Sequence, residues 1–273
     1  MSHVREPAVA GRFYPGRPAE LREMIERMLA ETSGEPQPAR GGVVPHAGLL
    51  YSGSCAARVF NQVSIPPVVV ILAPNHTGRY ENVGGAGAWD SGAFETPLGA
   101  LSVDEDFVTR LEAACPLVAH DPAAHRWEHA VEVELPFLAM LAPESRIVPL
   151  VLAWDDWAKS RTLACALAGV VRESPDDVLL LASSDMTHYE SAGRAAAKDR
   201  MALDAVERLD AEGLLAVCHR ENVTMCGRAP AAVVLEATRQ LGAERAEVVD
   251  YRHSGWVTGD DSSVVAYAGV VIR

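Results

Sequence analysis

The sequence predicts a single α/β domain over residues 1–273, with a largely parallel central sheet and helices on both faces of that sheet. Three observations carry this prediction. Short apolar runs typical of buried strands occur at 41–44, 68–72 and 178–182. Segments with helical spacing of apolar residues separate these runs, which favours parallel strands joined by helical crossovers. No internal repeat, low-complexity tract or linker divides the chain.

In the first half of the chain, a helix is expected to begin at Pro18, because proline is favoured at the first helical position and apolar residues follow at helical spacing. A Pro-containing loop over 34–40 follows, and then the strand at 41–44 and a helix opened by Ser52 and Gly53. The next strand begins after Pro66 and Pro67, and an irregular Gly-rich stretch over 77–99 follows it, with a short strand near 86–89. A helix over 103–115 with acidic residues in its first turn completes this half.

In the second half, residues 129–140 have helical spacing, and Pro136 either kinks that helix or marks its start. The remaining elements alternate between apolar strand patterns and helical patterns. They are strands at 147–152, 178–182, 247–251 and 264–272, and helices at 155–171, 192–209, 213–217 and after Cys226.

The composition is that of a soluble globular protein, with 49% hydrophobic and 22% charged residues. A net charge of −13 argues against nucleic acid or an anionic membrane as a partner. The five cysteines are odd in number and widely spaced, which favours a reducing cytoplasm over a disulfide framework. The start of the chain lacks the apolar stretch of a signal peptide, and no apolar run approaches the ~18 residues of a membrane span. We therefore expect a cytoplasmic protein.

The most informative pattern is a chemically active side chain just after each of several predicted strands. His46 follows the strand at 41–44, and His76 follows the strand at 68–72. Asp185 and His188 come after the strand at 178–182, and Cys226 precedes a helix. The carboxyl ends of strands in an open α/β sheet meet at one crevice, where ligands bind. The pattern therefore predicts a mononuclear metal or redox site.

Each of these residues has a plainer interpretation as well. His46 could simply bond a loop backbone, Asp185 could cap the next helix, and a cysteine can be a buried apolar residue. Against this, the start of a helix favours a thiolate at Cys226, and a nearby Arg228 adds to that effect. Asp185 is a candidate to orient a ligating imidazole, and His188 a candidate proton donor or acceptor.

A rival cluster is formed by His125, His129 and Glu132, which would share one helix face and hold zinc. This pattern lacks the internal glutamate of zinc helices and contains a proline nearby, so we place Glu128 and His129 near the mouth of the main site instead. Sequence motifs for nucleotide hydrolysis, dinucleotide binding and serine-hydrolase chemistry do not occur.

Six segments in this order resemble the Memo-like family, whose bacterial and archaeal members are also called AmmeMemoRadiSam system protein B. They are REPAVAGRFYP at 5–15, PHAG at 45–48, APNH at 73–76, EHAVEVELPFL at 128–138, SSDMTHY at 183–189 and CGR at 226–228. The resemblance implies a fold similar to that of the class III extradiol dioxygenases, which use non-heme iron(II).

By the same resemblance, the metal ligands would be His46, His76 and Cys226, with Asp185 and His188 beside them as catalytic residues. The dioxygenases complete their ligand set with a carboxylate, whereas the matching position here is Cys226. A thiolate favours Fe(II), Cu(I) or Zn(II) over hard cations. We expect Fe(II) first, with Cu or Zn as the alternatives.

These observations lead us to expect a non-heme iron redox protein or oxygenase-like enzyme, with positions at the metal left open for O2 or a small-molecule substrate. A second hypothesis is a non-catalytic pocket for a small ligand or a peptide, in a modification system that includes radical-SAM and AMMECR1-type proteins as partners. A third is a zinc-dependent hydrolase, in which the metal acidifies a bound water.

Overall fold

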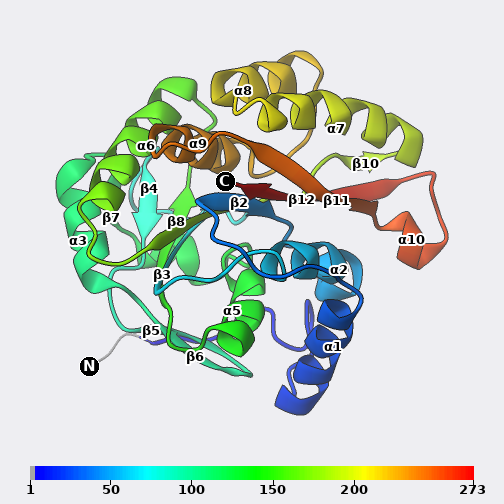
Figure 1. The fold of residues 1–273 in the computed structure, drawn as a ribbon, viewed down its shortest axis with the longest axis horizontal. Coiled ribbons are helices and arrows are strands. Elements are labelled where there is room, and N and C mark those ends of the chain that lie inside the picture. Colours follow the sequence, from blue (N-terminus) through cyan, green and yellow to red (C-terminus); the bar gives the residue numbers. More distant parts are fainter. Residues whose placement is uncertain (1–3) are drawn as a thin grey trace.

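The computed structural model describes residues 4–273, and its centre is one large mixed sheet (Figure 1). The sheet has the strand order β10-β12-β2-β9-β3-β8-β4-β7, and β11 pairs with β12 beside this path. The strands are β2 (Gly41–Val44), β3 (Val68–Pro74), β4 (Ala86–Ala88), β7 (Val118–His120), β8 (Arg146–Leu152), β9 (Val178–Ser183), β10 (His188–Glu190), β11 (Ala246–His253) and β12 (Val264–Ile272).

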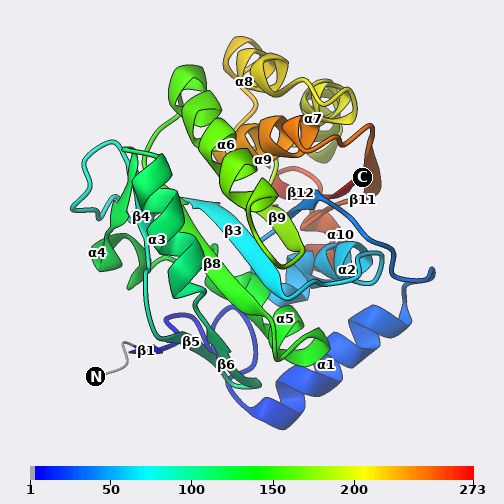
Figure 2. The same cartoon turned by 60° about the vertical axis from the view of Figure 1, so that its left-hand side comes forward.

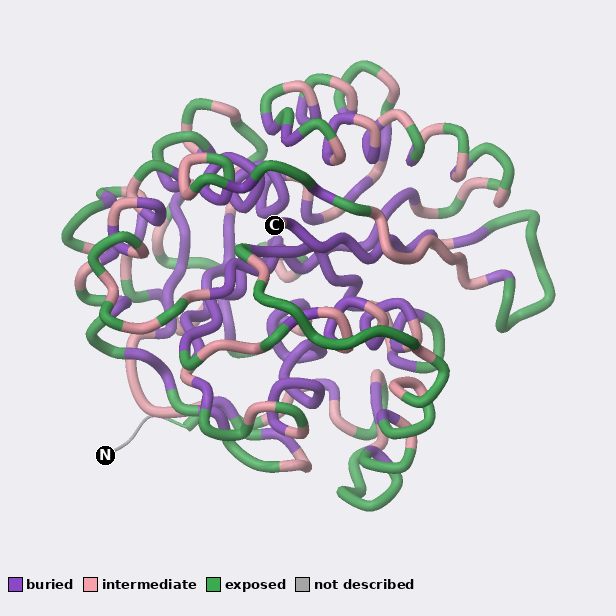
Figure 3. Tube along the Cα trace, in the orientation of Figure 1, coloured by how far each residue is buried: buried purple, intermediate pink, exposed green. Residues whose placement is uncertain are grey.

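The four central strands β2, β9, β3 and β8 run parallel, as the sequence predicts. All seven residues of β3 are buried, because helices cover both faces of the sheet at this strand. The edges differ from the centre: β12 is antiparallel to β2, and β4 is antiparallel to β8. Figure 3 shows the buried trace following the central strands and the exposed trace following the outer turns.

Two helical layers cover the sheet, as Figures 1 and 2 show. One layer contains α6 (Trp157–Arg172), α7 (Ala192–Glu207), α8 (Ala211–Arg220) and α9 (Arg228–Gln240). The other contains α1 (Pro18–Ala30), α2 (Leu49–Phe60) and α5 (Leu135–Leu141), while α3 (Glu105–Ala114) packs beside β8 and α6. Three of these helices are capped by aspartates, because the side chains of Asp104, Asp156 and Asp210 each accept a free backbone N–H of the first helical turn. The predicted α/β class with helices on both faces is confirmed.

A second, three-stranded sheet was not expected from the sequence. It has the order β1-β5-β6, from β1 (Val4–Arg5), β5 (Ala93–Thr96) and β6 (Gly99–Ser102). The stretch 77–99 is therefore only partly irregular. Near its end lies β5, which pairs in parallel with β1. Strand β1 is at the start of the described residues and lies far from β5 in sequence. Pairing of this kind leaves no local pattern in the sequence.

The amino-terminal segment from Arg5 to Tyr14 is tied to Glu132, which lies in the 3₁₀ turn η1 (Glu132–Glu134). The Glu132 carboxylate pairs with the buried Arg5 guanidinium. It also accepts backbone N–H bonds from Ala8 at 2.8 Å and Val9 at 2.9 Å, and the Tyr14 hydroxyl bond at 2.6 Å. Four groups thus satisfy one buried carboxylate, which fixes this segment against the body of the protein.

Two predicted helix boundaries need correction. Helix α2 begins at Leu49 rather than at Ser52, because Gly48 already occupies the position before the helix and the backbone bonds start there. The predicted helix over 129–140 is interrupted: a turn precedes η1, and α5 begins at Leu135 with Pro136 in its first turn. The short helices are α4 (Pro122–His125) and α10 (Gly255–Thr258). Within residues 4–273, no helix combines the length and apolar character that a bilayer crossing requires.

Candidate metal centre

The side chains that follow the central strands meet at the carboxyl end of the sheet. His46 lies two residues after β2, His76 two residues after β3, and Asp185 two residues after β9. Cys226 lies two residues before α9. Since β2, β9 and β3 are parallel neighbours, their ends lie side by side and bring these segments together.

Three imidazoles form the core of the site. Their ring centroids are 5.1 Å apart for His46 and His76, 5.4 Å for His46 and His129, and 4.7 Å for His76 and His129. One nitrogen from each ring lies within 4.8 Å of the others. His46 is buried, His129 is half-buried and His76 is exposed. The cluster is therefore open to solvent on the side of His76.

The Cys226 thiol lies next to this cluster. Its Sγ is 3.3 Å from His46 Nε2, and the Asp185 N–H donates to Sγ at 3.3 Å. Burial alone would raise the pKa of Cys226, but His46 and His76 outweigh this effect and lower the pKa to about 6. Cys226 is the one cysteine of the five beside the histidines, and all five thiols are free. Its surroundings are those of a reactive or metal-binding thiolate.

Glu128 orients two of the imidazoles. One carboxylate oxygen accepts the backbone N–H of His76 at 2.6 Å, and the other contacts the ring nitrogen His76 Nδ1 at 2.9 Å. That second oxygen also accepts the backbone N–H groups of His129 and Ala130, at 2.8 and 3.0 Å. Because Nδ1 of His76 is bonded to Glu128, Nε2 is left for the centre of the cluster. The sequence predicts Glu128 and His129 near the mouth of the site; in the structure Glu128 is buried and His129 is half-buried.

The environment separates the pKa values of the three histidines. Burial lowers the pKa of His46, and burial with the nearby His76 lowers the pKa of His129 to about 4. Burial would also lower the pKa of His76, but Cys226 and Glu128 raise it to about 10. His46 and His129 are therefore neutral near pH 7, the form of imidazole that binds a metal ion.

Asp185 acts on the backbone of a candidate ligand rather than on its ring. Asp185 Oδ1 accepts the N–H groups of His46 at 2.9 Å and Ala47 at 3.2 Å. This bond pair holds the turn that carries His46. Burial raises the pKa of Asp185 to about 6. The interpretation of Asp185 as a cap of the following helix does not hold, because that helix, α7, begins only at Ala192.

His188 stands apart from the three-imidazole group, at the start of β10. Its backbone N–H donates to the Thr224 hydroxyl at 2.8 Å, and its Nδ1 lies 3.1 Å from the Thr224 carbonyl oxygen. These contacts leave Nε2 for other partners. The next residue, Tyr189, has a φ of 60° and is 79% exposed. A tyrosine in this sparsely populated conformation is often found near functional sites.

The rival cluster of His125, His129 and Glu132 is not assembled. His125 Nε2 bonds the Gly87 carbonyl at 2.8 Å, and Glu132 binds the amino-terminal segment. The physical reason is that α4 ends at His125 and the chain then turns, so that the three residues share no helix face. Of this trio only His129 reaches the main site.

The donor set fits a metal ion. Imidazole nitrogen and thiolate sulfur are ligands of zinc, iron and copper, and each binds at roughly 2.0–2.3 Å. In a tetrahedral set at these bond lengths, two donors lie roughly 3.3–3.8 Å apart. The three nitrogens lie within 4.8 Å of one another, so the rings would move closer by up to about 1.5 Å to bind one ion. A pocket of about 200 Å³ lies beside Cys226 and is bordered by Trp154, Asp155 and Arg228.

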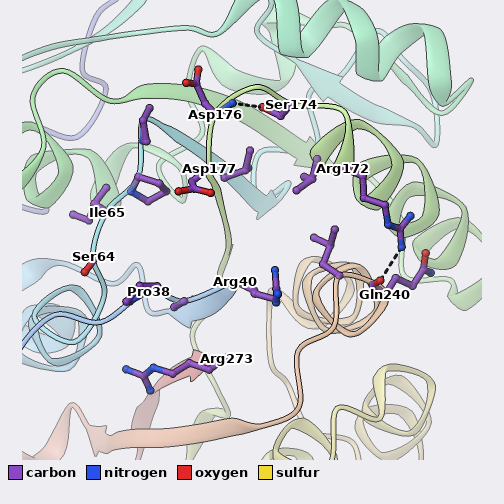
Figure 4. A pocket seen from close by; sticks show the side chains of 16 residues that line it. Pro38, Arg40, Ser64, Ile65, Arg172, Ser174, Asp176, Asp177, Gln240 and Arg273 are labelled. Carbon is purple, nitrogen blue, oxygen red and sulfur yellow. Dashed lines mark hydrogen bonds between the residues drawn. The ribbon is translucent and has the colours of Figure 1, made fainter.

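A larger cavity, of about 730 Å³, lies at the opposite end of the sheet (Figure 4). It is bordered by the loop before β2, the loop before β9 and the ends of α6 and α9. Its charged lining residues are Arg40, Arg172, Arg273, Asp176 and Asp177. Among residues 4–273, no histidine or cysteine borders it, and no sequence pattern indicates a site at this end.

Comparison with known proteins gives one consistent result. The family model described as "Memo-like protein" matches residues 5–271. A MEMO1 family protein of Methanopyrus kandleri is 41% identical, over 98% of this chain and 99% of the relative. A MEMO1 family protein of Aquifex aeolicus is 39% identical, over 98% of each chain, and one of Sulfolobus acidocaldarius is 37% identical, also over 98% of each.

Proposed function

The chain belongs to the Memo-like family, and from the side chains at its carboxyl-end site we propose that it is a metal-dependent redox protein with iron as the first candidate metal. One observation carries the proposal: three imidazole nitrogens lie within 4.8 Å of one another, with a thiol 3.3 Å from one of them. His46, His76 and Cys226 are the proposed ligands from sequence, and the geometry adds His129 to them.

The donor set decides which metals are reasonable. Imidazole and thiolate are softer than carboxylate and water, so the site favours Fe(II), Cu or Zn(II) over magnesium or calcium. An iron ion held here would supply one-electron and oxygen chemistry. The protein's own contribution would be to hold the donors, through Glu128 for two imidazoles and Asp185 for the turn at His46.

His188 is the proposed acid or base of the site. Its Nδ1 is occupied by the Thr224 carbonyl, which fixes the ring and leaves Nε2 to exchange a proton with a ligand. The pocket beside Cys226, of about 200 Å³, is the proposed entry for a small-molecule substrate or the side chain of a peptide.

The deciding experiment is metal content by mass spectrometry, on protein purified without oxygen and without an affinity tag. We expect near-stoichiometric iron in the wild type and a loss of nearly all of it in His46→Ala and Cys226→Ala. His120→Ala is the matched control, because His120 is exposed and pairs with Asp90 outside the cluster. Iron retained in either site variant, or no metal in the wild type, would overturn the proposal.

A zinc-dependent hydrolase is the second candidate, and one observation favours it. Three histidines form a ligand set known from catalytic zinc sites, in which a fourth position holds water. Zinc instead of iron in the wild type, with activity on ester or amide substrates under nitrogen, would select this candidate. Turnover that requires O2 would exclude it.

A further inference from the structure

Three groups meet the hydroxyl of Ser183 beneath His46. His46 Nδ1 lies 2.8 Å from Ser183 Oγ, the Ala130 carbonyl oxygen lies at 2.7 Å, and Glu134 Oε1 lies at 2.9 Å. Ser183 ends β9, and Glu134 ends the turn η1, so a strand and a turn far apart in sequence meet here. Ser183 and Glu134 are both fully buried, and water cannot replace any of these contacts from outside.

Counting protons assigns a direction to each bond. A serine hydroxyl has one proton to give and two lone pairs that accept. The Ala130 carbonyl can only accept, so it takes the Ser183 proton. His46 Nδ1 and Glu134 Oε1 must then both donate to Ser183 Oγ. His46 is thus protonated at Nδ1, and Glu134 carries a proton on Oε1.

The alternative arrangement is costly. If Glu134 were ionised, the Ser183 proton would turn toward it and the Ala130 carbonyl would lose its partner. Glu134 Oε2 has no hydrogen-bond partner, and within residues 4–273 no cation pairs with this carboxylate. A buried charge with a single hydrogen bond is among the most expensive groups that a protein interior can hold. Burial correspondingly raises the pKa of Glu134 well above its ordinary value.

We propose that Glu134 is a positioning residue, a buried neutral carboxylic acid that through Ser183 fixes His46 with Nδ1 protonated and Nε2 directed to Cys226 and the metal. The chain of contacts is continuous, because Nε2 on the far side of the same ring lies 3.3 Å from Cys226 Sγ. Histidines that bind metals commonly have the second nitrogen fixed in this way, usually by a carboxylate or a carbonyl. Here the hydroxyl of Ser183 connects the His46 ring to the Glu134 carboxylic acid by hydrogen bonds.

The effect at the metal rests on the proposed function, but the protonation of Glu134 does not. The first test is therefore infrared spectroscopy of the metal-free protein. We expect a carbonyl band of a protonated carboxylic acid near neutral pH, which shifts in D2O and disappears in Glu134→Gln. Glu236→Gln is the matched control, because Glu236 is buried to a similar degree but paired with Arg239. A wild type without the band, or a band that persists in Glu134→Gln, would overturn the proposal.

The second test measures metal affinity. Glu134→Gln keeps an N–H donor toward Ser183, so we expect an affinity within about threefold of wild type. Glu134→Leu and Ser183→Ala remove the donor chain, and we expect roughly a 10- to 100-fold weaker affinity. Equal losses in Glu134→Gln and Glu134→Leu would contradict a positioning role. If the wild type binds no metal, the proposed function fails while the infrared result still decides the state of Glu134.

Discussion

The two ends of the central sheet differ in what they offer to a ligand. The amino end has the larger cavity, about 730 Å³ (Figure 4), but among the described residues its lining consists of arginines, aspartates and uncharged polar or apolar residues. The carboxyl end has a pocket of only about 200 Å³, but Cys226 borders this pocket and its thiol lies beside the cluster of three histidines. The larger cavity is therefore not the place where potential metal ligands gather. The kind of side chain that follows each strand indicates the place where they do.

The direction of the helices explains the difference. At the carboxyl end, α2 begins after β2, α6 begins after β8, and α9 begins two residues after Cys226. The free N–H groups at the start of a helix favour an anionic group such as the Cys226 thiolate. The amino end of the sheet collects helix ends instead, whose carbonyl groups favour cations. Arg172, the last residue of α6, donates to the carbonyl of Gln240, the last residue of α9, at 2.7 Å. An arginine in the cavity wall thus already has a structural task.

The sharpest comparison uses one glycine at each end. A Cβ at Gly227 would lie 2.3 Å from the Ser183 carbonyl oxygen, and a Cβ at Gly41 would lie 2.6 Å from the Leu180 carbonyl oxygen. We expect Gly227→Ala and Gly41→Ala each to lower the free energy of unfolding by about 1–3 kcal/mol, because backbone must shift. Only Gly227→Ala should also weaken metal binding, since it displaces Cys226. Denaturant unfolding and metal titration of both variants test this, and equal metal affinities would contradict it.

The next comparison uses one carboxylate at each end. Glu128 is buried and holds His76 and His129, whereas Asp176 is half-buried and pairs with Arg146 at 2.6 Å. We expect Glu128→Gln to weaken metal affinity by roughly 10- to 100-fold, because it loosens two of the donors. Asp176→Asn should leave metal affinity unchanged and alter the free energy of unfolding by about 0–1 kcal/mol. Competition with a metal chelator measures the first effect, and a loss in Asp176→Asn would show that the two ends are coupled.

The smallest expected effect concerns pH. The pKa of Cys226 is lowered to about 6, so the thiolate is present above that pH and is lost as the pH falls through it. Metal affinity should therefore drop more steeply below about pH 6, by a further factor of about 10 per pH unit, because protons compete for Sγ. Metal titrations from pH 5 to 8 measure the slope. Asp177→Asn, at the amino end, should give the same curve, and a wild-type slope without a bend near 6 would contradict the prediction.

Much of this fold could be predicted from the sequence because the central strands are fully buried. The run at 68–72 has no polar position, which is typical of a strand buried on both faces, and it lies within β3. The residues that follow these strands could be placed together for the same reason. His129 could be placed only near the mouth, because its position depends on a turn between α4 and η1 that has no periodic pattern. The small sheet β1-β5-β6 was missed because it pairs segments about ninety residues apart.

The bond between the amino-terminal segment and Glu132 has a consequence for the order of folding. Arg5 and Glu132 are 127 positions apart, and Phe13 of the same segment packs against His129 with ring centroids 4.7 Å apart. Arg5 and Phe13 are synthesised before Glu132 and His129, so this segment must wait without its partners until more than a hundred further residues have followed. Until that moment one wall of the histidine cluster is missing. A bulky fusion placed before Arg5 would hinder this late docking of the amino-terminal segment. The histidine cluster would then be among the last parts of the protein to form.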